Sequence, residues 1–368
     1  MQALDRRQTY ESNGSGWRIS ICGLRLVSSQ ALAVGAVGLE RPDLEEGEVS
    51  VLYRVHARAL VCCVAAIAVL GALVFASAAG AAQVGGTYLA LGDSLAYGYH
   101  AAQFKSELES KGFVEPATFN DGYVDDFGAA LKLANPKLQI VNDGCPGETT
   151  ETLINGSGIP GYCAGGPTGS PFPYAFLHHS YGAHSSQLAD ALAVLKATPN
   201  VSPITLDIGA NDVLQFLGSK CGFPATFTCT PAEVEAEFGH IAANAYSILA
   251  QLHAAAPKAQ LVLIGLYNPY PTVLPAPGGD ATTAALNSAL SKVAAAVPGA
   301  SFANPEPLFN TSIVTHAPEA TDLPTICAFT AMCPGGTFNP ASPNADIHPT
   351  KLGYGVMAGV VGTDFLTH

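Results

Sequence analysis

Four short polar segments each follow or flank an apolar stretch, and together they offer a nucleophile, a base and hydrogen-bond donors. They are the segments at 92–94 (GDS), 144–149 (GCPGET), 209–212 (GAND) and 346–349 (DIHP). A serine hydroxyl is a poor nucleophile until a base removes its proton, and an imidazole does this near neutral pH. The oxyanion that forms when a hydroxyl attacks a carbonyl needs preorganised donors. The combination therefore indicates acyl transfer to a serine.

Each segment alone also has an ordinary structural explanation. Ser94 after Gly-Asp is a typical helix cap, and Asn211 with its neighbour is a common turn pair. Gly147 is first a loop glycine, and His348 before a proline is more often a surface histidine. The order of the four segments, and their placement at the ends of apolar runs, favour the chemical interpretation over these separate ones.

The elements that position these segments alternate between strands and helices. Short apolar runs predict strands at 87–91 (TYLAL), 138–141 (LQIV), 204–208 (ITLDI) and 260–266 (QLVLIGL), and Ala-rich stretches predict helices near 124–134, 185–197, 231–255, 281–296 and 350–366. This alternation is typical of a mostly parallel sheet covered on both faces. Ligands of such sheets bind beyond the carboxyl ends of the strands, where the polar segments lie.

The four segments resemble the sequence blocks of the GDSL or SGNH hydrolases. The matching stretches are 92–98 (GDSLAYG), Gly147 within 142–150 (NDGCPGETT), 209–212 (GAND) and 346–350 (DIHPT), and they occur in the family's order. The resemblance implies an α/β fold, a three-layer α/β/α sandwich with a mostly parallel, flavodoxin-like sheet. It also implies hydrolysis of carboxylic esters, as in the secreted bacterial lipase and esterase members.

The resemblance assigns roles to individual residues. Ser94 is expected to be the nucleophile that forms an acyl-enzyme, and His348 the general base and then acid. The backbone N–H groups of Ser94 and Gly147 and the side chain of Asn211 are expected to form the oxyanion hole. The family places an aspartate three residues before the histidine, but Ala345 stands there and Asp346 lies two residues before it. Either Asp346 or a backbone carbonyl then orients His348.

Other functions remain as alternatives. The fragments Asp-x-His and Gly-Asp also occur in metallophosphoesterases, which need several ligands around two metals. The altered acidic position would suit a non-catalytic, exported glycan-binding module, and carbohydrate acetylesterase or phospholipase activity is equally open. A classical α/β-hydrolase is disfavoured, since no Gly-x-Ser-x-Gly elbow surrounds Ser94. Aromatic residues at 172–177 are expected to form an apolar wall for an acyl chain. We expect no cofactor or metal, because a serine triad needs none.

Charge divides the chain into two parts. All seven Arg lie before residue 59, whereas residues 83–368 hold nine Lys and 22 acidic residues and so carry the whole formal charge of −13. An acidic body without Arg argues against nucleic-acid binding and against docking on anionic lipid. The expected partner is a small-molecule or lipid ester, and the expected oligomeric state is a monomer. Residues 83–368 are long enough for one large α/β domain or two small ones, and no linker long enough to split them occurs. The resemblance implies a single hydrolase domain at 83–368.

The amino-terminal residues are expected to lie outside the fold. Residues 59–82 (ALVCCVAAIAVLGALVFASAAGAA) follow a basic cluster and end in small residues, as in a secretory signal. We therefore expect a secreted protein; the alternative is a membrane anchor at 59–82 with the domain outside. Residues 51–82 are assigned to this segment, and residues 1–50 to a non-structural extension. A misplaced start codon, with initiation at Val49 or Val51, would explain the extension, and amino-terminal sequencing of the unprocessed protein tests this.

Cysteine usage is consistent with export. The body contains six cysteines: Cys145, Cys163, Cys221, Cys229, Cys327 and Cys333. An even number in an exported chain indicates disulfides, and six cysteines allow 15 pairings. Pairing of nearest neighbours would close three short loops. The spacings contain neither C-x-x-C nor a Cys/His cluster, so we do not expect a zinc site from them.

Overall fold

The computed structural model describes residues 84–164, 172–223, 226–273 and 279–368. The extension at 1–50 and the signal or anchor at 51–82, both expected from the sequence, lie outside the described residues. Within the described ranges, no helix combines the length and hydropathy needed to cross a bilayer.

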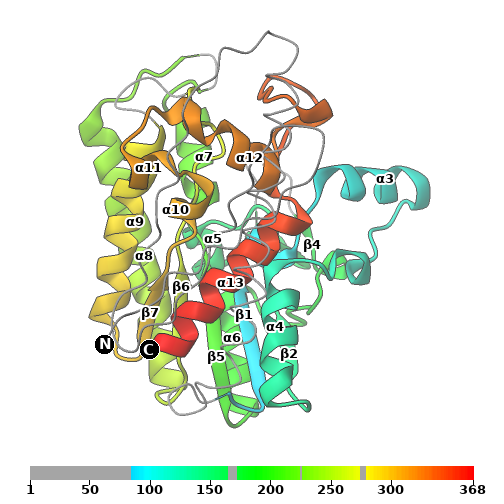
Figure 1. Cartoon of the computed structure of the whole chain (residues 1–368). Coiled ribbons are helices and arrows are strands. Elements are labelled where there is room, and N and C mark those ends of the chain that lie inside the picture. The colour runs from blue at the N-terminus through cyan, green and yellow to red at the C-terminus, as the bar shows by residue number, and fades with distance from the viewer. Residues whose placement is uncertain (1–83, 165–171, 224–225, 274–278) are drawn as a thin grey trace, which may run out of the picture. The chain divides into compact units, whose positions relative to one another are not determined.

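A single parallel sheet forms the centre of the fold (Figure 1). Its five strands are β1 (Thr87–Gly92), β2 (Gln139–Asn142), β5 (Val201–Asp207), β6 (Leu261–Ile264) and β7 (Ala300–Ala303). They run in the order β2-β1-β5-β6-β7, and all neighbouring pairs are parallel. Counted along the chain this is the order 2-1-3-4-5 of flavodoxin-like sheets. The α/β fold expected from the sequence is therefore confirmed.

Two strands differ from the sequence-based expectation. Strand β7 was not expected, because its four residues ASFA lack a long apolar run. Strand β5 begins at Val201 rather than at residue 204, and it includes Pro203. A proline in a central strand usually argues against that assignment, since it cannot donate to the ladder. Here the pairing between β1 and β5 has an irregularity at this point, and pairing with β6 begins only after Pro203, at Ile204.

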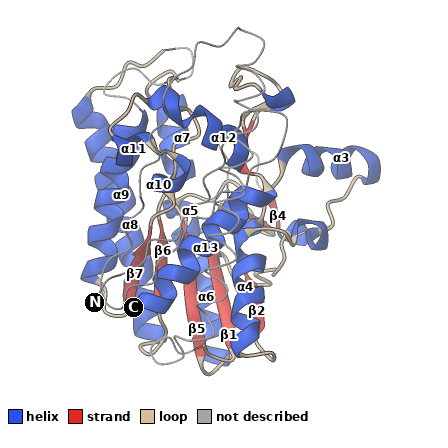
Figure 2. Ribbon diagram, in the orientation of Figure 1, coloured by secondary structure: helices blue, strands red, loops and turns tan. Residues whose placement is uncertain are grey.

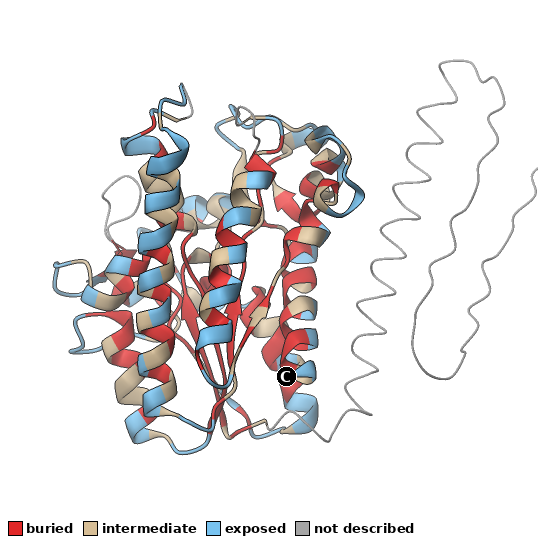
Figure 3. Cartoon of the chain, turned by 90° about the vertical axis from the view of Figure 1, so that its left-hand side faces the viewer, coloured by how far each residue is buried: buried red, intermediate tan, exposed pale blue. Residues whose placement is uncertain are grey.

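Helices cover both faces of the sheet, which gives three layers (Figures 2 and 3). One face packs against α6 (Gln187–Ala197), α8 (Pro231–Ala255) and α9 (Gly279–Ala296); the other packs against α4 (Tyr123–Ala134) and α13 (Lys351–Thr367). The five expected helices agree with these bounds to within two residues at each end. Leu89 of β1 joins the first core and Tyr88 the second, because successive strand side chains point to opposite faces.

Local sequence signals explain where the long helices begin. The Thr230 side chain caps α8 by accepting from the Glu233 N–H, and Pro231 occupies the first turn. Thr350 caps α13 in the same way, accepting from the Gly353 N–H. The shorter elements lie mostly at the carboxyl edge of the sheet or beside it. They are α2 (Ser94–Tyr97), α3 (Ala101–Lys111), α5 (Thr150–Asn155), β3 (Tyr162–Cys163), β4 (Phe172–Pro173), α7 (Ala210–Ser219), α10 (Glu306–Phe309), α11 (Ser312–Thr315), α12 (Leu323–Phe329), β8 (Thr330–Ala331) and β9 (Asp346–Pro349).

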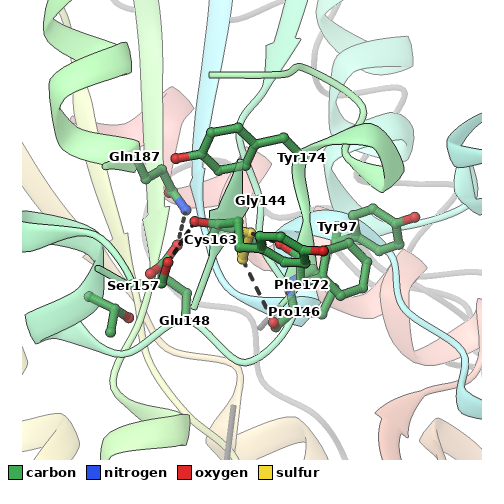
Figure 4. Close-up of a disulfide and its surroundings, with 12 residues drawn as sticks. Tyr97, Gly144, Pro146, Glu148, Ser157, Cys163, Phe172, Tyr174 and Gln187 are labelled. Carbon is green, nitrogen blue, oxygen red and sulfur yellow. Dashed lines mark hydrogen bonds between the residues drawn. A yellow bond between two sulfur atoms is a disulfide. The ribbon is translucent and has the colours of Figure 1, made fainter. Parts of the chain in front are cut away.

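All six body cysteines form disulfides between nearest neighbours. The pairs are Cys145–Cys163, Cys221–Cys229 and Cys327–Cys333, with sequence separations of 18, 8 and 6. The first joins the segment after β2 to strand β3 (Figure 4). The second closes the connection between α7 and α8, and the third joins the end of α12 to the segment after β8.

Candidate active site

The polar segments converge because three of them leave neighbouring strands at the same edge. Ser94 begins α2 directly after β1, and Asn211 lies in the first turn of α7 after β5. Gly92 and Asp207, the last residues of β1 and β5, are partners in the sheet, so the two segments start side by side. Gly147 follows β2, the strand on the other side of β1. His348 comes from β9, which pairs with β8 outside the main sheet.

Ser94, His348 and Asp346 form a hydrogen-bonded chain. The Ser94 Oγ lies 2.8 Å from His348 Nε2, and His348 Nδ1 lies 2.5 Å from Asp346 Oδ1. The spacing of two residues suffices because both lie on strand β9, where residues i and i+2 point to the same side. Asp346, not a backbone carbonyl, therefore contacts the imidazole Nδ1 in the structure. Ala345, at the family's acidic position, takes no part in this chain.

The Asp346 carboxylate is held ionised by its neighbours. Burial raises its pKa, but the hydrogen bond and charge of His348 and the N–H groups of Ala101 and His348 outweigh burial and lower the pKa to about 2. Oδ2 accepts from the Ala101 N–H at 2.8 Å, and Oδ1 also accepts from the His348 N–H at 3.2 Å. A carboxylate that stays charged can stabilise an imidazolium next to it.

Two tyrosines that the sequence reading missed support the histidine. The Tyr99 ring packs 4.8 Å from the His348 ring, and the Tyr267 hydroxyl donates to the Ile347 carbonyl at 2.6 Å. Both are aromatic residues in loops, and no local pattern distinguishes them from other aromatics of the chain.

The expected oxyanion donors lie on three segments, and the Asn211 side chain contacts the other two. Asn211 Nδ2 donates to Asp93 Oδ2 at 3.2 Å and to the Glu148 carbonyl at 3.0 Å, and thereby joins both segments. Gly147 has φ +87°, a left-handed conformation that favours glycine. Over the described residues, the N–H groups of Ser94 and Gly147 have no hydrogen-bond acceptor. Ser94, Asn211 and His348 line one pocket, whose lining does not include Gly147.

A buried side chain of helix α6 connects these segments from behind. Gln187 Oε1 accepts from the Gly92 N–H at 2.7 Å, and Nε2 donates to the Gly92 carbonyl at 2.9 Å and to Glu148 Oε2 at 3.2 Å. Figure 4 shows Gln187 and Glu148 beside the disulfide of Cys163. The only sequence signal for Gln187 is a polar residue on the inward face of an apolar helix.

Glu148 is a buried carboxyl group next to the oxyanion segment. Burial raises its pKa to about 8, although hydrogen bonds, including that from Gln187, act in the opposite direction. The charge of Asp93 raises the pKa of Glu148 further. The charge of Glu148 in turn raises the pKa values of Tyr174 and Tyr181. Its Oε1 is buried and has no hydrogen-bond partner among the described residues. Glu148 is therefore protonated, and uncharged, at neutral pH.

Asp93 and Asp207 form a pair of buried carboxyl groups beside the segment that carries Ser94. Asp207 accepts from the Tyr123 hydroxyl at 2.6 Å and from the Asp93 N–H at 3.2 Å. Asp93 Oδ1 caps α2 by accepting from the Leu95 N–H at 2.9 Å. Burial raises the pKa of both groups, that of Asp207 well above its ordinary value. A Cβ at Gly92 would lie 2.3 Å from Asp207 Oδ1, so only glycine fits there.

The pocket that holds Ser94 and His348 is lined mostly by apolar side chains, with Asp93, Asn211, Asn268, Thr282 and Thr283 as its other polar members. Its walls come from α7, α8 and α9, with Val213, Leu214, Leu217, Val234, Phe238 and Leu286 among the lining residues. The aromatic residues at 172–177, which the sequence suggested as an acyl wall, do not line this pocket. Phe172 instead packs 5.5 Å from the Tyr97 ring, in a separate buried cluster with Tyr174 and Leu177.

In the described ranges, two clusters of side chains bring together residue types that commonly bind metal ions. One consists of Cys145, Glu148 and Cys163, but both cysteines are bound in a disulfide. The other consists of Asp143, His179 and Asp190. Neither group includes Ser94 or His348.

Comparison with known proteins agrees with this arrangement. Residues 90–356 match the model of the GDSL-like lipase/acylhydrolase family. Among the curated proteins, none matches the sequence.

Several solved structures are similar to this chain at low sequence identity. An extracellular lipase from Streptomyces rimosus has 17% identity and a TM-score of 0.46, and the match covers 76% of this chain and 99% of the lipase. A variant of an acetyl-xylooligosaccharide esterase from Geobacillus has 15% identity and a TM-score of 0.44, and the match covers 77% of this chain and 95% of the esterase. Phospholipase A1 from Streptomyces albidoflavus has 18% identity and a TM-score of 0.41, and the match covers 76% of this chain and 100% of the phospholipase.

Glu148→Gln should remove an alkaline loss of activity. As the pH rises through about 8, Glu148 ionises and places a buried negative charge beside the segment where an oxyanion must form. We expect the wild-type kcat for an ester to fall about tenfold per pH unit above this value, and Glu148→Gln to keep its kcat. Steady-state kinetics from roughly pH 7 to 9.5 measure this. Glu151→Gln, an exposed position on α5, is the matched control. Equal alkaline losses in both variants would contradict the role of Glu148.

Proposed function

Because the chain belongs to the GDSL-like lipase/acylhydrolase family, we propose that it is a secreted serine esterase of Ser-His-Asp type. Family membership makes it a hydrolase acting on ester bonds. Beyond this, we propose which residues are catalytic, that an acyl-enzyme forms, that the substrate has an apolar acyl group and that the protein is exported. The observation that carries it is the chain from Asp346 through His348 to Ser94, with contacts of 2.5 and 2.8 Å.

Acylation follows from this chain of hydrogen bonds. Ser94 Oγ attacks the ester carbonyl carbon while His348 Nε2 accepts its proton, and the Asp346 carboxylate stabilises the imidazolium. The negative charge moves to the carbonyl oxygen. When this tetrahedral intermediate collapses, the bond to the alcohol oxygen breaks and His348 gives the proton to the leaving alcohol. The acyl group remains on Ser94.

The oxyanion is stabilised by the N–H groups of Ser94 and Gly147 and by the Asn211 side chain. Two features support this assignment: both backbone N–H groups lack an acceptor among the described residues, and Asn211 already contacts the segment that carries Gly147. Water then transfers a proton to His348 and attacks the acyl carbonyl. Ser94 regains its proton as the acid leaves.

The substrate class follows from the pocket. Helices α7, α8 and α9 present apolar side chains to the space next to Ser94, and this environment suits an acyl chain longer than acetyl. Three disulfides support export to an oxidising compartment, together with the signal expected at 51–82.

Ser94→Ala tests the serine mechanism. The purified protein, with its disulfides formed, is assayed on p-nitrophenyl esters from acetyl to palmitoyl with EDTA present. We expect the wild type to hydrolyse them and kcat to fall on the order of 10⁴-fold or more in Ser94→Ala, because no nucleophile remains. Ser110→Ala, at an exposed serine, should be unaffected. Hydrolysis that persists in Ser94→Ala, or a folded wild type without activity on any ester, would contradict the proposal.

Asp346→Ala tests the acidic residue. Without the carboxylate, His348 loses its oriented Nδ1 hydrogen bond and the charge that stabilises its protonated form. We expect kcat to fall about 10²- to 10⁴-fold with little change in KM. The control is Asp121→Ala, which removes the carboxylate of another Asp–His pair, 3.1 Å from His100. A loss of only a few-fold at Asp346 would show that a backbone carbonyl suffices.

Leu214→Trp tests the acyl pocket. The larger side chain on α7 should occupy space needed by a long acyl chain, so that kcat/KM for decanoate falls about tenfold or more while that for acetate changes little. The control is Gln215→Trp, because the neighbouring residue on the same helix does not line the pocket. An unchanged chain-length profile in Leu214→Trp would place the acyl chain elsewhere.

A further inference from the structure

Three segments bring a second group of titratable side chains together, away from the pocket. Asp143 directly follows β2, His179 lies in the loop between β4 and α6, and Asp190 lies in the first turn of α6. His179 Nδ1 is 2.7 Å from Asp143 Oδ1 and 3.2 Å from Asp190 Oδ2. A second imidazole, His184, has its Nε2 3.9 Å from Asp190 Oδ1.

Hydrogen bonding within this cluster leaves carboxylate oxygens without partners. The ring nitrogen Nδ1 of His179 carries at most one hydrogen, which it donates to Asp143. Asp190 Oδ2 faces the same nitrogen but is buried and has no hydrogen-bond partner in the part of the chain that the structure describes, and the same holds for Asp143 Oδ2. The two aspartates are 4% and 0% exposed. A buried carboxylate oxygen without a donor is costly, and such a group calls for an explanation.

We propose that Asp143, His179 and Asp190 bind one divalent transition-metal ion of the zinc type. Two carboxylates and an imidazole are a donor set that Zn²⁺ accepts, whereas Ca²⁺ takes oxygen ligands only. Ligands at the usual bond lengths around a tetrahedral ion lie about 3.4 Å apart, so contacts of 2.7 and 3.2 Å need only small shifts. The ion takes the place of the Nδ1 proton of His179, which leaves to solvent.

The exposure of the two histidines indicates how the metal ion enters the site and which group is its fourth ligand. The His179 side chain is 38% exposed and that of His184 is 44% exposed, so an ion can enter from solvent although both carboxylates are buried. His184 or a water molecule completes the coordination. No sequence pattern indicates this site, because its ligands lie at irregular spacings on three segments.

The ion would act on stability rather than on the reaction. Asp143 lies four residues before Gly147, and its carbonyl accepts from the Tyr181 hydroxyl at 2.5 Å. Asp190 lies one helical turn after Gln187, the residue that holds Gly92 and Glu148. A metal bridge between the two aspartates therefore clamps helix α6 to the segment that leads to the oxyanion donor.

Zinc binding to the metal-free protein tests the proposal. The purified protein is treated with EDTA, exchanged into chelator-free buffer and titrated with ZnCl2 by calorimetry. We expect one Zn²⁺ per chain and a rise in Tm, both absent with CaCl2. His179→Gln should weaken Zn²⁺ binding at least tenfold and abolish the rise in Tm. His240→Gln, which removes an exposed imidazole on α8, should change neither.

Further variants make the outcome decisive. Asp190→Asn should weaken binding as His179→Gln does, whereas His348→Ala should leave one Zn²⁺ per chain because its imidazole belongs to the pocket. Co²⁺ should give visible absorption bands in the wild type that are lost in His179→Gln, an independent readout if calorimetry is obscured. Equal Zn²⁺ affinity in the wild type, His179→Gln and Asp190→Asn would overturn the proposal and leave an imidazolium paired with two carboxylates. Hydrolysis in EDTA is unaffected by either result, so this proposal fails or stands separately from the proposed function.

Discussion

The backbone N–H and carbonyl of Gly92 both form hydrogen bonds with one side chain, that of Gln187. Gly92 lies where strand β1 ends and the segment that carries Ser94 begins. The same amide reaches Glu148, whose carbonyl accepts from Asn211. A buried polar group must find a partner, and here each partner belongs to a different segment. Satisfying these groups therefore fixes the relative positions of the proposed nucleophile, the oxyanion segment and helix α7.

Burial of acidic groups behind Ser94 explains how an acidic chain builds an apolar pocket. Burial raises the pKa of Asp207, and that of Glu148 to about 8, and the neutral form of such a group takes part in hydrogen bonds without adding charge. Asp346 is the exception. Its contacts with His348 and Ala101 outweigh burial and keep it ionised, which is the state that an orienting carboxylate requires.

Helix α7 joins the polar and apolar parts of the site. Gly209, with φ +110°, turns the chain from β5 into the helix, and Asn211 follows in the first turn beside Asp93. Leu214, about one turn further along, and Leu217, about two turns further along, line the pocket. A single rigid element thus places a proposed oxyanion donor and a proposed acyl wall at a constant distance from each other, and the Cys221–Cys229 disulfide closes the connection that follows it.

The sequence by itself determined the alternating elements, the bounds of the five long helices to within two residues, and the four polar segments, because each depends on local periodicity or capping. It left the cysteine pairing open among 15 possibilities, and the structure shows the nearest-neighbour set. It did not determine strand β7, whose four residues carry no pattern, or the contact of Asp346 with His348, which depends on both lying on one strand. It also pointed to an acyl wall at residues 172–177, which do not line the pocket next to Ser94. Gln187 lies 95 residues from Gly92, and Asp143 lies 36 residues from His179. Only tertiary structure brings such residues together, since their partners are chosen by packing across the sheet edge and not by neighbours in the chain.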